Sequence, residues 1–150
     1  MSDMNRLSTV IALILMSVGV MAQDISITAG QLPKTVTELI DEAFPDDSIK
    51  SIKIEKRASL VQYEVRLTGK VKLQFSKDGK FTQCECSGKR AVPQVLVPGR
   101  ITEYVEKNYK GHKVMNLEHD SKLWEVVLDN GVELDFNESF RLVDVDSNDD

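Results

Sequence analysis

The chain has 150 residues, of which 41% are hydrophobic and 29% are charged. This composition is typical of a folded globular protein and excludes a largely disordered one. The formal net charge is −5, and the sequence contains no long run of Lys or Arg. Because nucleic-acid binding requires clustered cations, the charge pattern argues against a nucleic-acid partner.

The first 22 residues have the pattern of a secretory signal peptide. Arg6 lies in a short polar start, an apolar run follows, and the small residues Val20 and Ala22 precede the expected cleavage point. The run is short for a membrane-spanning helix, which needs about 20 apolar residues. We therefore predict a signal peptide over residues 1–22, a periplasmic or secreted mature protein, and no stable membrane insertion after cleavage. An uncleaved N-terminal anchor is the alternative.

Two segments, 32–44 and 97–109, each predict a helix that begins near a proline. Pro33 and Pro98 are 65 positions apart, and the same offset relates the apolar residues of the two segments. These residues recur at i, i+3, i+4 and i+8, which places them on one face of a helix. The pairs are Val36 with Ile101, Leu39 with Tyr104, Ile40 with Val105, and Phe44 with Tyr109.

After each helix, apolar and polar residues alternate with the period of half-buried strands. Asp78-Gly79 and Asn130-Gly131 are typical of tight turns between such strands. We expect strands at about residues 49–57, 60–67, 70–76 and 80–86, and again at 113–119, 122–129, 131–137 and 141–146.

The predicted fold class is α+β, a tandem repeat of a helix plus a four-stranded antiparallel meander, with the helices packed on one face of the sheet. The first repeat is expected over residues 23–88 and the second over residues 97–150, including an acidic C-terminal tail. Residues 89–96 are the predicted linker.

The repeated motif resembles a known family. A proline-led amphipathic helix followed by "YEVRL" (63–67) or "WEVVLDNGVELDF" (124–136) is similar to the PepSY-like, putative β-lactamase-inhibitor-like family of exported bacterial proteins. The resemblance covers Leu32 to Asp146, and it rests on core and turn residues. It implies a periplasmic or secreted location, tandem units of one helix and four strands, no known catalytic residues, and binding or inhibition of other proteins through the open sheet face.

The open sheet face is the candidate interaction surface. If the apolar strand residues point toward the helices, their polar neighbours point away from them. The candidate partner-binding residues on this face are Gln62, Arg66, Lys70, Lys72, Glu125, Glu133 and Asp135. Glu64 and Glu125 are interpreted as surface strand residues. A solvated face without a partner is the alternative interpretation.

The two halves of the chain carry opposite charge. Residues 23–91 contain 12 Lys and Arg against 10 Asp and Glu, net +2, whereas residues 92–150 contain 6 against 13, net −7. Such a surface is suited to a partner with two oppositely charged regions, including a second copy of the chain. The face as predicted lacks Tyr, Trp and Phe, which argues against tight capture of a β-lactamase.

Three other groups of residues are candidates for chemical sites. Cys84 and Cys86 are compatible with buried thiols, with a disulfide assisted by a bulge, or with an intermolecular bridge or metal contact. His112 and His119 are expected on opposite sides of a strand, which does not favour a shared metal. Asp144, Asp146 and Asn148 have the spacing of calcium ligands, but an EF-hand glycine and glutamate do not follow, so a frayed acidic tail is favoured.

No catalytic motif is present in the sequence, and we predict neither an enzyme nor a bound cofactor or metal. The leading hypothesis is an exported, non-enzymatic binding module, inhibitor-type or otherwise. It would engage a protein or peptide through the open polar sheet face. The alternative is an envelope protein that binds a cation or small ligand through the acidic C-terminal half.

Overall fold

The computed structural model describes residues 23–147, which form nine β-strands, two α-helices and two short 3-10 helices. The strands are β1 (Gln23–Ser26), β2 (Ile49–Arg57), β3 (Leu60–Leu67), β4 (Val71–Ser76), β5 (Phe81–Cys86), β6 (Val114–His119), β7 (Leu123–Leu128), β8 (Glu133–Asn137) and β9 (Leu142–Asp146). The helices are η1 (Ala29–Gln31), α2 (Lys34–Ala43), η2 (Gln94–Leu96) and α3 (Gly99–Asn108). The predicted signal peptide at 1–22 and Asn148 of the tail lie outside the described residues.

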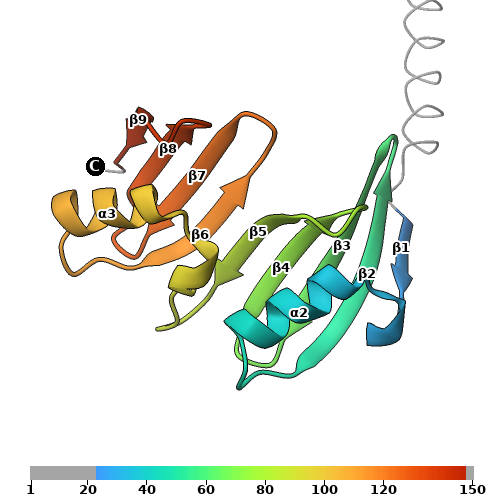
Figure 1. Ribbon diagram of the computed structural model, residues 1–150. Helices are drawn as coiled ribbons and strands as arrows, with labels where there is room; N and C mark the ends of the chain where they lie inside the picture. The colour runs from blue at the N-terminus through green and yellow to red at the C-terminus, as the bar shows by residue number, and fades with distance from the viewer. Residues whose placement is uncertain (1–22, 148–150) are drawn as a thin grey trace, which may run out of the picture.

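All nine strands belong to one antiparallel sheet, in which the order of the strands is their order in the chain. Figure 1 shows α2 lying across β2–β4 and α3 lying beside β6–β9. The eight strands expected from the alternation of apolar and polar residues are confirmed as β2–β9, each within two residues of the expected bounds. Both predicted helices are also present.

The predicted tandem arrangement is wrong, although the α+β class is correct. β5 pairs with β6, so the strands form one continuous sheet instead of two helix-plus-four-strand units with the helices on one face. An additional strand, β1, extends this sheet beyond β2. Unpaired strand edges expose backbone donors and acceptors, and the β5–β6 pairing satisfies one such edge on each of these strands.

The core forms where the apolar faces of the helices meet the inward residues of the strands. The buried helix residues are Val36, Ile40, Ile101 and Val105. They belong to one hydrophobic cluster with residues of β2–β8, and burial of each such side chain contributes about 1.5–3 kcal/mol relative to exposure. The Tyr104 ring of α3 also packs edge-on against Phe136 of β8, with 5.3 Å between centroids.

Cys84 and Cys86 are both buried and free, with 3.9 Å between their Sγ atoms. Of the three alternatives considered from the sequence, this arrangement is the pair of buried thiols. The contact with Cys86, together with burial, raises the pKa of Cys84. Cys84 therefore stays protonated and behaves as a small apolar core residue.

An ion pair ties the segment after β5 to the segment between α2 and β2. Arg90 Nη1 donates to Asp47 Oδ1 at 2.9 Å, and the Arg90 guanidinium lies over the Phe44 ring, 5.4 Å from its centroid. The Asp47 side chain is only 7% exposed, so water screens this pair weakly. Gly69, in the β3–β4 turn, lies directly against the pair, because a Cβ there would overlap Arg90 Nη1 and come within 2.6 Å of Asp47 Oδ1. The three segments therefore hold one another in place.

We predict that Gly69→Ala lowers the free energy of unfolding by roughly 1–2 kcal/mol, because the added methyl group displaces Arg90 from Asp47. Urea unfolding followed by circular dichroism measures the change. Gly99→Ala is the matched control, since a Cβ at Gly99 meets no atom within 4 Å. Equal stabilities of the two variants would show that Arg90 moves aside without cost and that the ion pair does not anchor the turn.

Candidate functional site

The side of the sheet opposite its buried apolar residues, such as Val65 and Val126, carries two continuous rows of cross-strand neighbours. Residues opposite each other on adjacent antiparallel strands share one side of a sheet. The first row, from β2 to β9, is Lys53, Glu64, Gln74, Gln83, Glu118, Glu125, Asp135 and Asp144. The second row is Ser51, Arg66, Lys72, Glu85, Asn116, Val127, Glu133 and Asp146. We call these two rows the polar face.

The charge of the polar face changes sign along the sheet. Its cations, Lys53, Arg66 and Lys72, all lie on β2–β4. Strands β6–β9 contribute Asn116, Val127 and otherwise only carboxylates. The opposite charges of the two halves therefore reach one surface, with the basic part and the acidic part joined through β5.

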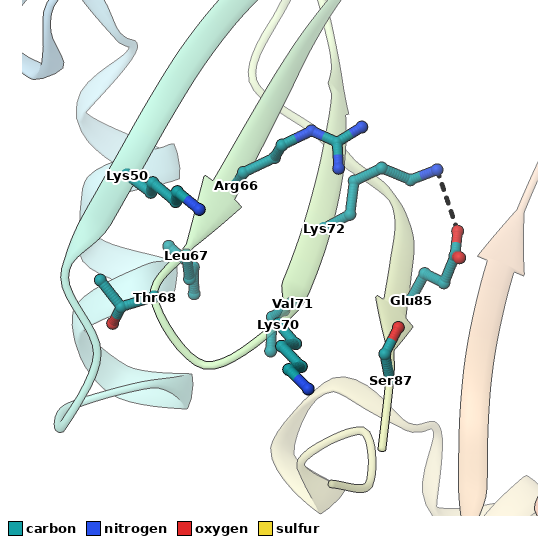
Figure 2. Close-up of a pocket in the computed structure, with 9 residues that line it drawn as sticks. All are labelled: Lys50, Arg66, Leu67, Thr68, Lys70, Val71, Lys72, Glu85 and Ser87. Carbon is teal, nitrogen blue, oxygen red and sulfur yellow. Dashed lines mark ion pairs between the residues drawn. The ribbon is translucent and has the colours of Figure 1, made fainter.

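A basic pocket of about 440 Å³ opens at the β3–β4 end of the polar face (Figure 2). Its charged lining residues are Lys50, Arg66, Lys70, Lys72 and Glu85, and Thr68 and Ser87 add hydroxyl groups. Lys72 Nζ pairs with Glu85 Oε2 at 2.9 Å. The pocket thus brings together three of the predicted partner-binding residues, those of the basic group.

Lys50 belongs to this pocket because of a β-bulge that the alternation of residues does not reveal. The register between β2 and β3 shifts between Ile49 and Ser51, so Lys50 is the extra residue of the bulge. A bulge redirects a side chain that would otherwise alternate to the other side of the strand. In Figure 2 the Lys50 side chain extends toward Arg66.

The interpretation of Glu64 as a surface strand residue is wrong, because Glu64 is only 7% exposed. Its Oε1 atom accepts a hydrogen bond from Arg66 Nε at 2.8 Å. A buried carboxylate needs such a partner, since an unpaired charge out of water is costly. Arg66 is therefore held by Glu64 through Nε, and its terminal nitrogens are not part of this hydrogen bond.

Gln62 lies outside both charged pockets of the polar face. Its Nε2 atom donates to Glu55 Oε2 of β2 at 2.6 Å. The hydrogen bond from Gln62 is the main cause that lowers the pKa of Glu55. Gln62 is thus placed on the predicted side of β3 but is separate from the other six candidate residues.

An acidic pocket of about 190 Å³ lies over β6–β8. It brings together the other three predicted residues, Glu125, Glu133 and Asp135, and adds Glu118. Glu118 of this pocket and Glu85 of the basic pocket were not among the binding residues predicted from the sequence. Each of them follows a buried residue in its strand, Leu117 and Cys84 respectively. That alternation was the available signal.

Crowding changes the acidity of the carboxylates in this pocket. Partial burial, followed by repulsion from Asp135 and Glu118, raises the pKa of Glu125. Partial burial and repulsion from Asp144 raise the pKa of Asp135. Because the folded state then binds protons more tightly than the unfolded state, the contribution of these groups to stability falls as pH rises through their pKa values. A cation at this pocket would relieve the same repulsion.

His112 and His119 belong to neither row of the polar face, whereas Asp144 and Asp146 of the predicted tail lie on β9 at the ends of the two rows. His112 Nδ1 contacts Asp129 Oδ1 at 2.7 Å, and the His119 ring stacks on Trp124 with 3.9 Å between centroids. In the described part of the chain, no three His, Cys, Asp or Glu side chains are arranged to hold a metal ion. Over the same residues, no helix combines the length and apolar character needed to cross a membrane.

Known proteins similar to this chain were found through both sequence and structure. A crystal structure of a putative calcium-regulated periplasmic protein from Bacteroides thetaiotaomicron has a TM-score of 0.80 and 34% identity, and covers 83% of this chain and 97% of its own. A putative periplasmic protein from Bacteroides vulgatus has a TM-score of 0.80 and 36% identity, with 83% and 98% covered. A second Bacteroides vulgatus protein, a putative periplasmic protein of unknown function, has a TM-score of 0.78 and 29% identity, with 83% and 100% covered. No curated protein matches the sequence.

The family described as "Putative beta-lactamase-inhibitor-like, PepSY-like" matches residues 19–83 and 61–144, which together make up most of the chain. The match confirms the resemblance drawn from the helix and strand motifs, and the periplasmic relatives support an exported location. The chain therefore belongs to the PepSY-like, β-lactamase-inhibitor-like family.

Proposed function

We propose that the protein is an exported, non-enzymatic binding module that holds a protein or peptide on its polar face. The observation that carries this proposal is the register of the sheet, which aligns cations on β2–β4 with carboxylates on β6–β9 in two uninterrupted rows. A partner with the reverse order of charges meets complementary groups along the whole face. A second copy of the chain in antiparallel orientation has that order.

The spacing of the strands sets the size of the partner surface. Neighbouring strands lie about 4.8 Å apart, so β3 and β8 are separated by roughly 24 Å across the sheet. The partner must therefore present its acidic and basic groups at about this separation. Because neither row contains Tyr, Trp or Phe, charge complementarity, and not aromatic anchoring, would provide recognition. This composition does not favour a β-lactamase as the target.

We predict that the triple charge reversal Arg66→Glu, Lys70→Glu and Lys72→Glu removes the partner that the wild-type protein captures from native periplasm. Reversal replaces attraction by repulsion at the basic end of the polar face, so binding falls by at least tenfold, or about 1.4 kcal/mol. Affinity capture with quantitative mass spectrometry, at low and at high salt, measures the loss.

The matched control reverses Lys34, Lys107 and Lys110 to Glu, which changes net charge by the same amount on the helices and the segment after α3. This control should retain the partner. Retention of the same partner by the polar-face variant, or its loss from both variants, would contradict binding through the polar face.

The acidic pocket supports a second candidate function, in which the protein binds a divalent cation. The supporting observations are the crowding that raises the pKa values of Glu125 and Asp135 and the description of one 34%-identical relative as calcium-regulated. Calcium prefers carboxylate and carbonyl oxygens, which Glu118, Glu133 and Asn116 also supply at this pocket. The carboxylates must close in on the ion, because they are not arranged as a ligand set among the described residues.

For this candidate we expect calorimetry to detect calcium with a dissociation constant on the order of 10⁻⁴–10⁻³ M, as in extracellular modules. Glu125→Gln with Asp135→Asn should weaken it about tenfold or more, whereas Glu103→Gln with Glu106→Gln on α3 should leave it unchanged. Binding should be weaker at pH 5 than at pH 7.5, because the raised pKa values let protons compete. Unchanged affinity in the pocket variant would place any calcium elsewhere.

A further inference from the structure

The basic pocket holds more positive charge than its own carboxylate balances. Four cations line it, and Glu85, which pairs with Lys72, is the one acidic residue of the lining. Glu64 lies beside Arg66 but engages only Nε, which leaves the terminal guanidinium nitrogens as donors. Among the described residues, neither Lys50 nor Lys70 has a carboxylate within ion-pair distance. The local excess of two to three positive charges contrasts with a chain whose net charge is −5.

The backbone at Lys50 and Lys70 is held in place by contacts within the protein, without a ligand. Lys50 is placed by the β2 bulge, and Lys70 sits in the β3–β4 turn with a φ of 61°. That turn is bonded on two sides: Thr68 N donates to the Ser48 carbonyl at 3.0 Å, and Ser87 N donates to the Lys70 carbonyl at 3.2 Å. Gly69 packs against the Arg90–Asp47 pair. A preorganised site loses less free energy on binding than one that must be ordered by its ligand.

The chemistry of the lining matches phosphate better than carboxylate. A phosphate monoester carries up to two negative charges and three free oxygens, whereas a carboxylate carries one charge and two oxygens. A guanidinium such as that of Arg66 donates two parallel hydrogen bonds to phosphate, and ammonium groups act on it as point charges. Thr68 and Ser87 add hydroxyl donors at the rim. The volume of about 440 Å³ lies in the range of small-molecule sites.

We propose that the basic pocket binds the phosphate group of a small molecule, either a soluble phosphate ester or a lipid headgroup. This inference rests on the proposed function, because the pocket is the basic end of the polar face. It names the chemistry of one ligand there, for which the donors would be Lys50, Lys70 and the terminal nitrogens of Arg66, the lining cations that are not paired with Glu85. The same group would compete with an acidic segment of a protein partner.

Calorimetric titration of the purified chain with pyrophosphate tests the site, with malonate as the dicarboxylate comparison. Pyrophosphate should bind at least tenfold more tightly than malonate. Lys50→Gln with Lys70→Gln should weaken pyrophosphate binding about tenfold or more, because each variant removes a charge-assisted contact. Both side chains are exposed, so folding should be unaffected, and circular dichroism checks this. Lys107→Gln with Lys110→Gln on and after α3 is the matched control and should bind as the wild type does.

Co-sedimentation with phosphatidylcholine vesicles that contain phosphatidic acid distinguishes the two sources of phosphate. Binding of pyrophosphate without vesicle binding supports a soluble ester, and binding of both supports a lipid headgroup. Absence of pyrophosphate binding, equally tight binding of malonate, or an equal loss of pyrophosphate binding in the control pair would overturn the inference. Those outcomes leave the proposed protein-binding function standing if the charge-reversal variant still loses its captured partner.

Discussion

The pairing of β5 with β6 is the constraint on which the rest of the molecule depends. It consists of Gln83 opposite Glu118, Cys84 opposite Leu117, and Glu85 opposite Asn116. The middle pair is buried in the core, and the outer pairs lie on the polar face. A slip of one residue would place Leu117 in water and carboxylates in the core, so burial of this middle pair fixes the register. The continuous charged surface exists only because this register is kept.

The acidic part of the polar face destabilises the folded state through repulsion between neighbouring carboxylates. Glu118, Glu125, Asp135 and Asp144 are consecutive cross-strand neighbours, and like charges directly opposite each other are unfavourable by roughly 0.2–1 kcal/mol per pair. Val126 and Leu134, on the buried side of the same strands, are fully inaccessible and offset this cost. The retention of this repulsive row by a well-packed sheet agrees with the proposed binding of cationic groups, whether of a partner protein or of a metal ion.

Much of the secondary structure could be predicted because it follows from local periodicity. Alternation around Val65 and Val126 located the strands and the side of the sheet on which Arg66 and Glu125 lie. Local periodicity did not predict β1 or the pairing of β5 with β6. β1 has four residues and is too short to show a clear alternation. The β5–β6 pairing joins two segments that are separated in the chain by α3. The place of Lys50 depends on a bulge, and the burial of Glu64 depends on its contact with Arg66.

The last strand of the sheet has a consequence for how the molecule behaves in concentrated solution. Within residues 23–147, β9 is the last strand of the sheet, and its residues Val143 and Val145 are 54% and 43% exposed. No strand of this part of the chain pairs with its outer backbone edge, so another chain can add there. Asp144 and Asp146 alternate with these valines and give every approaching copy the same charge. The Debye length shortens to about 8 Å at physiological ionic strength, so added salt weakens the repulsion between the β9 strands of two copies. Low ionic strength therefore disfavours pairing of two chains through their β9 edges, and added salt favours such edge-to-edge growth.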